Sequence, residues 1–133
     1  MHAESRTHLD VRLKRAYDQA APSDGYRVLI DRLWPRGVSR TSADLDEWDR
    51  ELPPSTELRQ WFGHDPNRFD EFRRRYIEEL RGARPRLAAL RRRAREGTVT
   101  LVYSARDSDH NDAVVLAEVL RRGLPTERKG TQP

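Results

Sequence analysis

Two short apolar segments, Tyr26–Leu33 and Thr98–Tyr103, lie far apart in the chain, and the residues between them have a helical pattern. Their Val-Leu-Ile and Leu-Val centres are typical of strands that are buried on both faces of a sheet. A parallel pair of strands needs a long crossover between its members, and this crossover is usually helical. The sequence therefore predicts an α/β fold: a single domain with a small open, mostly parallel sheet and helices packed over it.

Turn and capping residues indicate where the other elements begin and end. Val11–Arg15 alternates apolar and polar residues and predicts a further strand. Helices are expected over Ser42–Leu52, Ser55–Phe62, Asp65–Leu80, the segment that ends before Gly97, and Asn111–Arg122. Residues 1–9 and 124–133 are mostly polar, and we expect them to be flexible tails on either side of a single domain at residues 10–123.

The composition excludes several classes of protein. The chain has 133 residues, of which 35% are hydrophobic and 36% charged, so it is polar but can still form a modest core. It has no cysteine, which excludes disulfides, thiolate catalysis and cysteine-bound metals. No segment resembles a membrane span or a signal peptide. We expect a cytoplasmic bacterial protein, monomeric or homodimeric, without contact to a membrane and without a cofactor.

Polar loops follow both apolar strands. In open α/β sheets, ligands bind outside the carboxyl ends of the strands, so the two loops are expected to form one crevice. Arginine side chains and the N-terminus of the following helix favour a phosphate or a carboxylate there. The predicted function is therefore the binding of a small anionic ligand. Six side chains are expected to contact it: Arg32, Trp34, Arg36, Ser104, Arg106 and Asn111.

The same loops also allow simpler structural interpretations, which stay open at this point. Asp31 and Arg32 could form an ion pair, and Trp34 could fill the end of the sheet. Asp109 or Asn111 could cap the last helix.

Two other chemistries are weaker alternatives. Ser104 and His110 could act as a nucleophile and its base, although no orienting acid is evident. Several potential ligands of a hard metal ion crowd the same loop, but such groups more often form turns and caps. They are Asp107, Asp109, His110 and Asp112. No catalytic residue and no metal site is assigned, and whether the protein is an enzyme is left open.

A basic segment offers an alternative function. Eleven arginines and five acidic residues lie between Arg68 and Glu96, whereas the whole chain has a net charge of only +4. Such a stripe could bind nucleic acid, weakly and without sequence preference, in an accessory protein. The same residues would equally serve as solvated helix faces. We favour the small anionic ligand because the two loops are harder to explain as plain surface.

Four stretches of the chain carry a resemblance to a known family. They read RAYD, DGYRVLIDRLWPRG, LDEWDRELPPSTELRQWF and TLVYSARD, the last followed shortly by HNDAVVLAEVL. In this order they resemble the YeaO-like branch of the bacterial family catalogued as domain of unknown function 488, over Val11–Gly123. The resemblance implies a compact α/β fold and no established activity. More distant members carry cysteines near the places of Ser104 and Asp109, so their thiol chemistry does not carry over to this chain.

Overall fold

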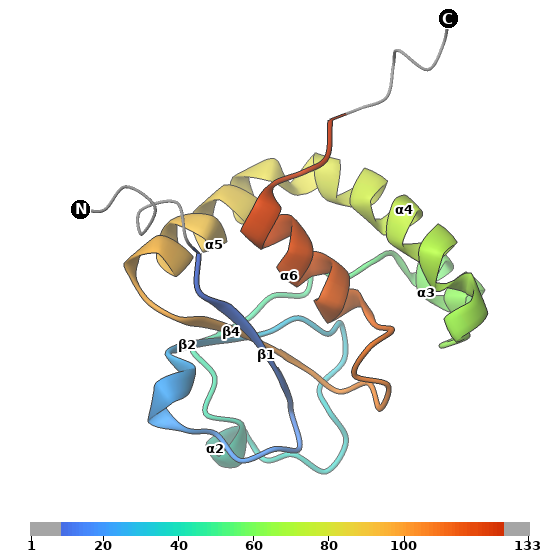
Figure 1. The fold of residues 1–133 in the computed structure, drawn as a ribbon. Coiled ribbons are helices and arrows are strands. Elements are labelled where there is room, and N and C mark those ends of the chain that lie inside the picture. Colours follow the sequence, from blue (N-terminus) through green and yellow to red (C-terminus); the bar gives the residue numbers. More distant parts are fainter. Residues whose placement is uncertain (1–8, 127–133) are drawn as a thin grey trace, which may run out of the picture.

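The protein forms a four-stranded sheet that is covered by helices, as the computed structural model of residues 9–126 shows (Figure 1). The strands are β1 (Val11–Arg15), β2 (Tyr26–Leu29), β3 (Glu47–Trp48) and β4 (Val99–Tyr103). Their order is β1-β4-β2-β3, and every pair is parallel. The predicted α/β fold class is confirmed, and so is the prediction that the two apolar strands, β2 and β4, are parallel neighbours.

The helices follow the strands in the order that the crossovers require. They are α2 (Arg40–Ala43), α3 (Thr56–Phe62), α4 (Phe69–Leu80), α5 (Arg84–Glu96) and α6 (Asp112–Arg122), with short 3-10 turns at Pro22–Asp24, Pro66–Arg68 and Arg81–Ala83. Over residues 9–126, none of them has the length and apolar content needed to cross a membrane. The expected tails, 1–9 and 124–133, lie outside the described residues except for residues 9 and 124–126.

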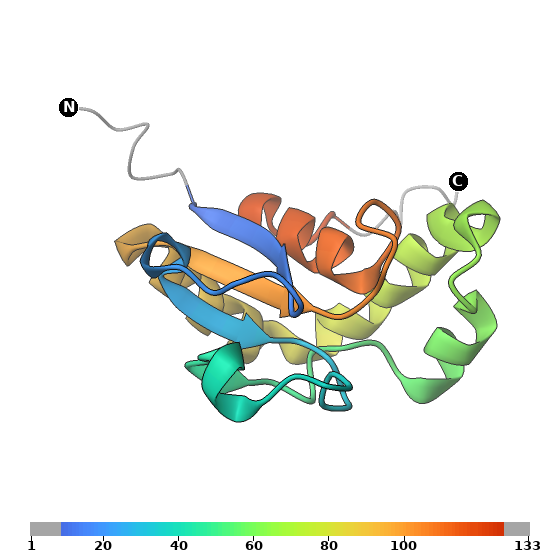
Figure 2. The ribbon, with the colours of Figure 1, turned by 90° about the horizontal axis from the view of Figure 1, so that it is seen from below.

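The core lies mainly on one face of the sheet. β4 is the central strand and is buried along its whole length. Val99, Leu101 and Tyr103 point from it into the main core, which α4, α5 and α6 cover. Val102 points the other way, into a smaller cluster that includes Leu29. Figure 2 shows α2 away from α6, near the strand β2. Burial on both faces explains why β2 and β4 have continuous apolar centres.

Helical spacing decides which side chains of the crossover reach the core. Phe72, Tyr76 and Leu80 of α4 are each at most 2% exposed, and they lie four residues apart on one stripe. Full burial of such a side chain stabilises the fold by about 1.5–3 kcal/mol. The helix α3 begins where Ser55 accepts a hydrogen bond from the Leu58 N–H, and it ends at Gly63 in the left-handed conformation. These signals are the ones that predicted α3 and α4.

The predicted helix over Ser42–Leu52 is wrong. Ser39 caps a single helical turn, and Asp44, with φ of 47°, ends it in the left-handed conformation. The chain then pairs with β2 as the short edge strand β3. The near-helical spacing of Leu45 and Trp48 therefore reflects packing of both side chains against the smaller cluster and not one helix face.

The predicted strand Tyr26–Leu33 is shorter in the structure. β2 ends at Leu29, which pairs with Val102 of β4 and with Trp48, the last residue of β3; the last ladder-like bonds join Ile30 N to Val102 O and Asp49 N to Leu29 O. The chain that follows leaves the sheet as a loop, so all of DRLWPRG lies beyond the strand.

Candidate functional site

The loops after β2 and β4 meet at one edge of the sheet. Because the two strands are parallel neighbours, both chains leave the sheet at the same end. Residues 31–36, 104–107 and 111–112 line a cavity of about 710 Å3 there, together with Pro53, Pro54 and parts of α3 and α4. Ligand pockets in proteins usually measure roughly 300–1,000 Å3. The cavity is therefore large enough for a small organic ligand.

The six side chains predicted to contact a ligand all line this cavity: Arg32, Trp34, Arg36, Ser104, Arg106 and Asn111. That they bind a ligand stays a prediction. The structure nevertheless divides them, because some already make hydrogen bonds within the fold and others do not.

Arg32 and Trp34 hold the first loop in place. The Arg32 guanidinium donates hydrogen bonds to the carbonyl oxygens of Pro54 (2.9 Å) and Pro53 (3.2 Å) instead of forming an ion pair with Asp31. The Trp34 indole N–H donates to the Val38 carbonyl at 2.6 Å. Its ring also packs edge-on against Trp48, as a residue that fills the sheet end would. Both side chains thus shape the cavity wall.

Asn111 caps the helix α6. Its side-chain oxygen accepts a hydrogen bond from the Val114 N–H at 3.0 Å, and its amide group donates to the Asp107 carbonyl at 2.7 Å. The first residue of the helix is Asp112, whose carboxyl group occupies the positive end of the helix dipole. The helix N-terminus is therefore less available to an external anion than the sequence suggested.

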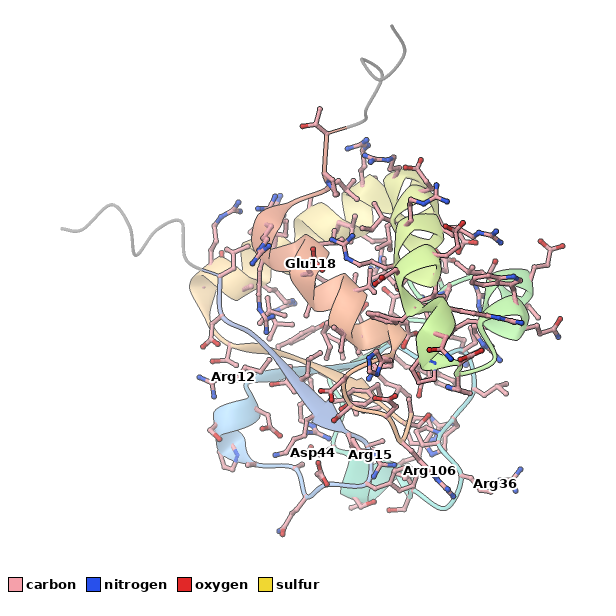
Figure 3. The ribbon with its side chains drawn as sticks, turned by 45° about the vertical axis from the view of Figure 1, so that its right-hand side comes forward. Arg12, Arg15, Arg36, Asp44, Arg106 and Glu118 are labelled. Carbon is pink, nitrogen blue, oxygen red and sulfur yellow. The ribbon has the colours of Figure 1, made fainter. Side chains whose placement is uncertain are left out.

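Three other guanidinium groups at the cavity remain without such bonds. Arg36, Arg106 and Arg59 of α3 line it, and within residues 9–126 none of these guanidinium groups makes a hydrogen bond or a salt bridge. Figure 3 shows Arg36 and Arg106 at the same end of the molecule, near Arg15. Arg15 braces the second loop by donating to the Ala105 carbonyl at 3.0 Å. The cavity thus presents positive charge that the protein itself does not neutralise by direct contact.

Two carboxylates, Asp31 and Asp112, line the same cavity. Burial raises the pKa of Asp31, although the hydroxyl and N–H of Ser104 and the charge of Arg59 oppose the shift. Burial, and then the negative charge of Asp31, raise the pKa of Asp112 to about 7. Two acids whose charges interact in this way resist simultaneous ionisation, as in catalytic carboxylate pairs. Perturbed acids in a cavity are typical of functional sites.

That Ser104 and His110 act as a nucleophile and its base stays a prediction; among the described residues no hydrogen bond joins their side chains. The His110 ring nitrogen Nδ1 lies 3.0 Å from Asp107 Oδ2, and the ring meets Phe69 edge-on at 5.2 Å between centroids. Asp107 Oδ1 also accepts the N–H groups of Asp109 and His110, which is turn chemistry. Among the described residues, no group of three or more His, Asp or Glu side chains is placed to hold a metal ion.

About half of the arginines in the basic stripe from Arg68 to Glu96 are paired with acids. Arg73 binds Glu118, Arg74 and Arg75 bind Glu71, Arg81 binds Glu78, and Arg86 binds Glu47 and Asp49. Two of these partners, Glu47 and Asp49, belong to the segment before α3, which lies outside the stripe in the sequence. Three of these acids, Glu118, Glu47 and Asp49, lie outside the stripe and offset about half of its local excess of positive charge.

Arg59, Asp31 and Asp112 were not among the predicted ligand-binding residues. The sequence suggested Asp31, in the loop after the second apolar strand, only as an ion-pair partner of Arg32. It suggested Asp112 only as a possible metal ligand. Arg59 has no local signal, because it lies on a short helix whose position over the strand ends depends on the tertiary fold.

Comparison with known proteins places most of the chain in one family. The model of a family described as "Inactive DUF488-N3 subclade" matches residues 10–133. The protein "Uncharacterized protein YeaO" of Escherichia coli (strain K12) is 45% identical over 113 residues, which are 85% of this chain and 98% of that protein. "Uncharacterized protein Rv3073c" of Mycobacterium tuberculosis (strain H37Rv) is 43% identical over 110 residues, 83% of this chain and 92% of that protein. No solved structure matches the chain.

Proposed function

Since the chain belongs to the DUF488 family, in the subclade described as inactive, we propose that it binds a small phosphate- or carboxylate-bearing ligand rather than transforming one. The binding site is the cavity between the loops that follow β2 and β4. The observation that carries the proposal is the group of three arginines at this cavity, Arg36, Arg59 and Arg106, whose guanidinium groups make no hydrogen bond or salt bridge within residues 9–126.

Physical chemistry supports an anion as the partner of these arginines. A guanidinium group offers five N–H donors in a planar fork that matches the oxygens of a phosphate or carboxylate. Arg32 differs from these three arginines, because protein carbonyl oxygens already accept hydrogen bonds from its guanidinium group. Ser104 adds a hydroxyl group to the same cavity. Within the described residues Ser104 makes no hydrogen bond to His110, which supports binding without nucleophilic catalysis.

Isothermal titration calorimetry with phosphorylated and carboxylated metabolites tests the proposal. A charge-assisted hydrogen bond contributes about 1.5–3 kcal/mol, so Arg106→Ala and Arg36→Ala should each weaken binding about ten- to a hundredfold. Both side chains are exposed, so the fold should persist. Arg92→Ala is the matched control, because Arg92 is an exposed arginine on α5 outside the cavity. Equal losses in all three variants, or no binding by the wild type, would contradict the proposal.

A further inference from the structure

The cavity contains two carboxylates, which a site for a simple anion does not need. Asp31 is the second residue after β2, and Asp112 is the first residue of α6, so two separate elements bring carboxylates to a site that also holds arginines. The aromatic side chains of Phe62 and Phe72, each at most 5% exposed, line the same cavity. A bare anion would be repelled by the carboxylates and would gain nothing from the apolar wall.

One oxygen of this carboxylate pair has no partner in the fold. Asp31 Oδ2 is buried and accepts no hydrogen bond from the described residues. An acceptor left in this state costs about 1–3 kcal/mol, and more when it is charged. Buried polar atoms without partners are rare in native proteins, and functional sites are among the places where they occur. The atom therefore marks this part of the cavity as more than a structural wall.

The size of the cavity points in the same direction. Its volume of about 710 Å3 exceeds by more than an order of magnitude the share of one water molecule in the liquid, about 30 Å3. A single tetrahedral anion would leave most of this space unused. The cavity fits a ligand with an organic body that reaches from the arginines to the carboxylates.

We propose that the ligand is a small organic anion that also carries hydroxyl or amino groups. Its phosphate or carboxylate contacts Arg36, Arg59 and Arg106, and its hydroxyl or amino hydrogens are donated to Asp31 and Asp112. This inference rests on the proposed function and deepens it, because it assigns the opposite end of the same site. Ligands of this class include sugar phosphates and phosphorylated amino acids.

The proposed arrangement also fixes the direction in which the ligand lies. Ionised Asp31 favours donors and disfavours negative charge, so the anionic group is kept at the arginine end. Removing the charge of Asp31 should then have opposite effects on two kinds of ligand. Binding of a donor-bearing ligand loses a charge-assisted hydrogen bond, whereas binding of a plain anion loses only repulsion.

Calorimetric titrations near neutral pH with four probes test the inference: methyl phosphate, glycerol 3-phosphate, ribose 5-phosphate and O-phosphoserine. At least one of the three donor-bearing probes should bind the wild type about tenfold or more tightly than methyl phosphate does. Asp31→Asn should weaken that probe about tenfold while leaving methyl phosphate binding unchanged or stronger. Glu57→Gln, which removes one exposed acid of α3 outside the cavity, should change neither affinity.

The outcomes separate this inference from the proposed function. If all four probes bind alike and Arg106→Ala weakens all of them, the anion site stands and the carboxylate end is refuted. If no probe binds, or if Arg106→Ala changes nothing, the anion site itself is refuted and the inference falls with it. Should Asp31→Asn fail to give a folded protein by circular dichroism, Asp112→Asn takes its place, and it should likewise weaken the donor-bearing probe without weakening methyl phosphate.

Discussion

Asp24 shows how a single acidic residue can hold the end of the sheet opposite the cavity. It is 7% exposed and accepts hydrogen bonds from Arg27 at 2.6 Å, from Lys14 at 3.0 Å and from the Ala21 N–H at 3.0 Å. Burial alone would raise the pKa of Asp24, but these three donors together lower it below its usual value. Arg27 is itself 2% exposed and also donates to the Ala43 carbonyl. The two residues join the start of β2 to α2.

We predict that Asp24→Asn destabilises the protein by about 3–5 kcal/mol, because it leaves the buried charge of Arg27 without its counter-ion. Urea denaturation near neutral pH measures the change. Asp18→Asn is the control: Asp18 is exposed, and its substitution should alter the free energy of unfolding by no more than about 0.5 kcal/mol. Because the folded-state pKa of Asp24 is lowered, its contribution is present above the unfolded pKa and is lost as the pH falls through the folded value.

Asp112 has the opposite linkage to pH. Its pKa rises from 3.8 in the unfolded chain to about 7 in the folded protein, through burial and the charge of Asp31, while Arg59 opposes the shift. The negative charge of Asp112 in turn helps to raise the pKa of the buried Tyr76 of α4, after burial itself. The folded state therefore retains a proton that the unfolded chain releases, and stability falls as the pH rises from about 4 through 7.

Asp112→Asn should accordingly stabilise the protein more at about pH 8 than at about pH 5. At about 1.36 kcal/mol per pKa unit, the gain at the higher pH has an upper bound of about 4 kcal/mol. The first position of α6 prefers an acid by about 0.3–1 kcal/mol, which reduces the gain slightly. Urea denaturation over this pH range provides the test. A difference between variant and wild type that is independent of pH would show that Asp112 does not titrate as described.

The secondary-structure elements differ in how far the sequence could predict them. The helices α4 and α6 follow from apolar stripes and caps that lie within each helix, such as Asn111 before α6. The segment from Ser42 to Leu52 could not be predicted in this way, because its short strand β3 exists only where β2 offers a free edge. A pattern within one segment cannot show which edge of a sheet another segment leaves open.

Element packing also determines what the arginine-rich helices can bind. Of the arginines in α4 and α5, several are held by acids of α4, of α6 and of the region around β3. Each such pair lowers the positive potential that a polyanion would meet. The net positive charge counted from the sequence of the stripe is therefore larger than the positive charge that a polyanion would meet at this surface.

We predict weak nucleic-acid binding that disappears near physiological ionic strength, about 0.15 M. Binding of this kind depends on the release of counterions and weakens steeply as salt rises. Fluorescence anisotropy of labelled single- and double-stranded oligonucleotides, measured from low salt upward, gives the answer. Tight binding of one defined sequence at physiological salt would favour nucleic-acid binding over the binding of a small anionic ligand as the function of this chain.

At the scale of the whole molecule, topology is what made the site partly predictable. Two adjacent parallel strands were expected, so the loops after them were expected to meet, and the cavity lies where they do. The contributions of Arg59 and Phe72 could not be predicted, because they arrive from α3 and α4 through the crossover. The burial of Asp31, which changes its chemistry, is likewise a property of the assembled fold.

The position of β4 in the sheet has a consequence for how the protein folds during its synthesis on the ribosome. β1 and β2 do not pair with each other, because β4 lies between them. β1 is complete at Arg15, whereas β4 is complete only at Tyr103. At synthesis rates of about 5–20 residues per second, β1 waits roughly 4–18 s for its partner. During that time β2 can pair only with the two-residue strand β3, and β1 has no partner strand until translation has almost finished.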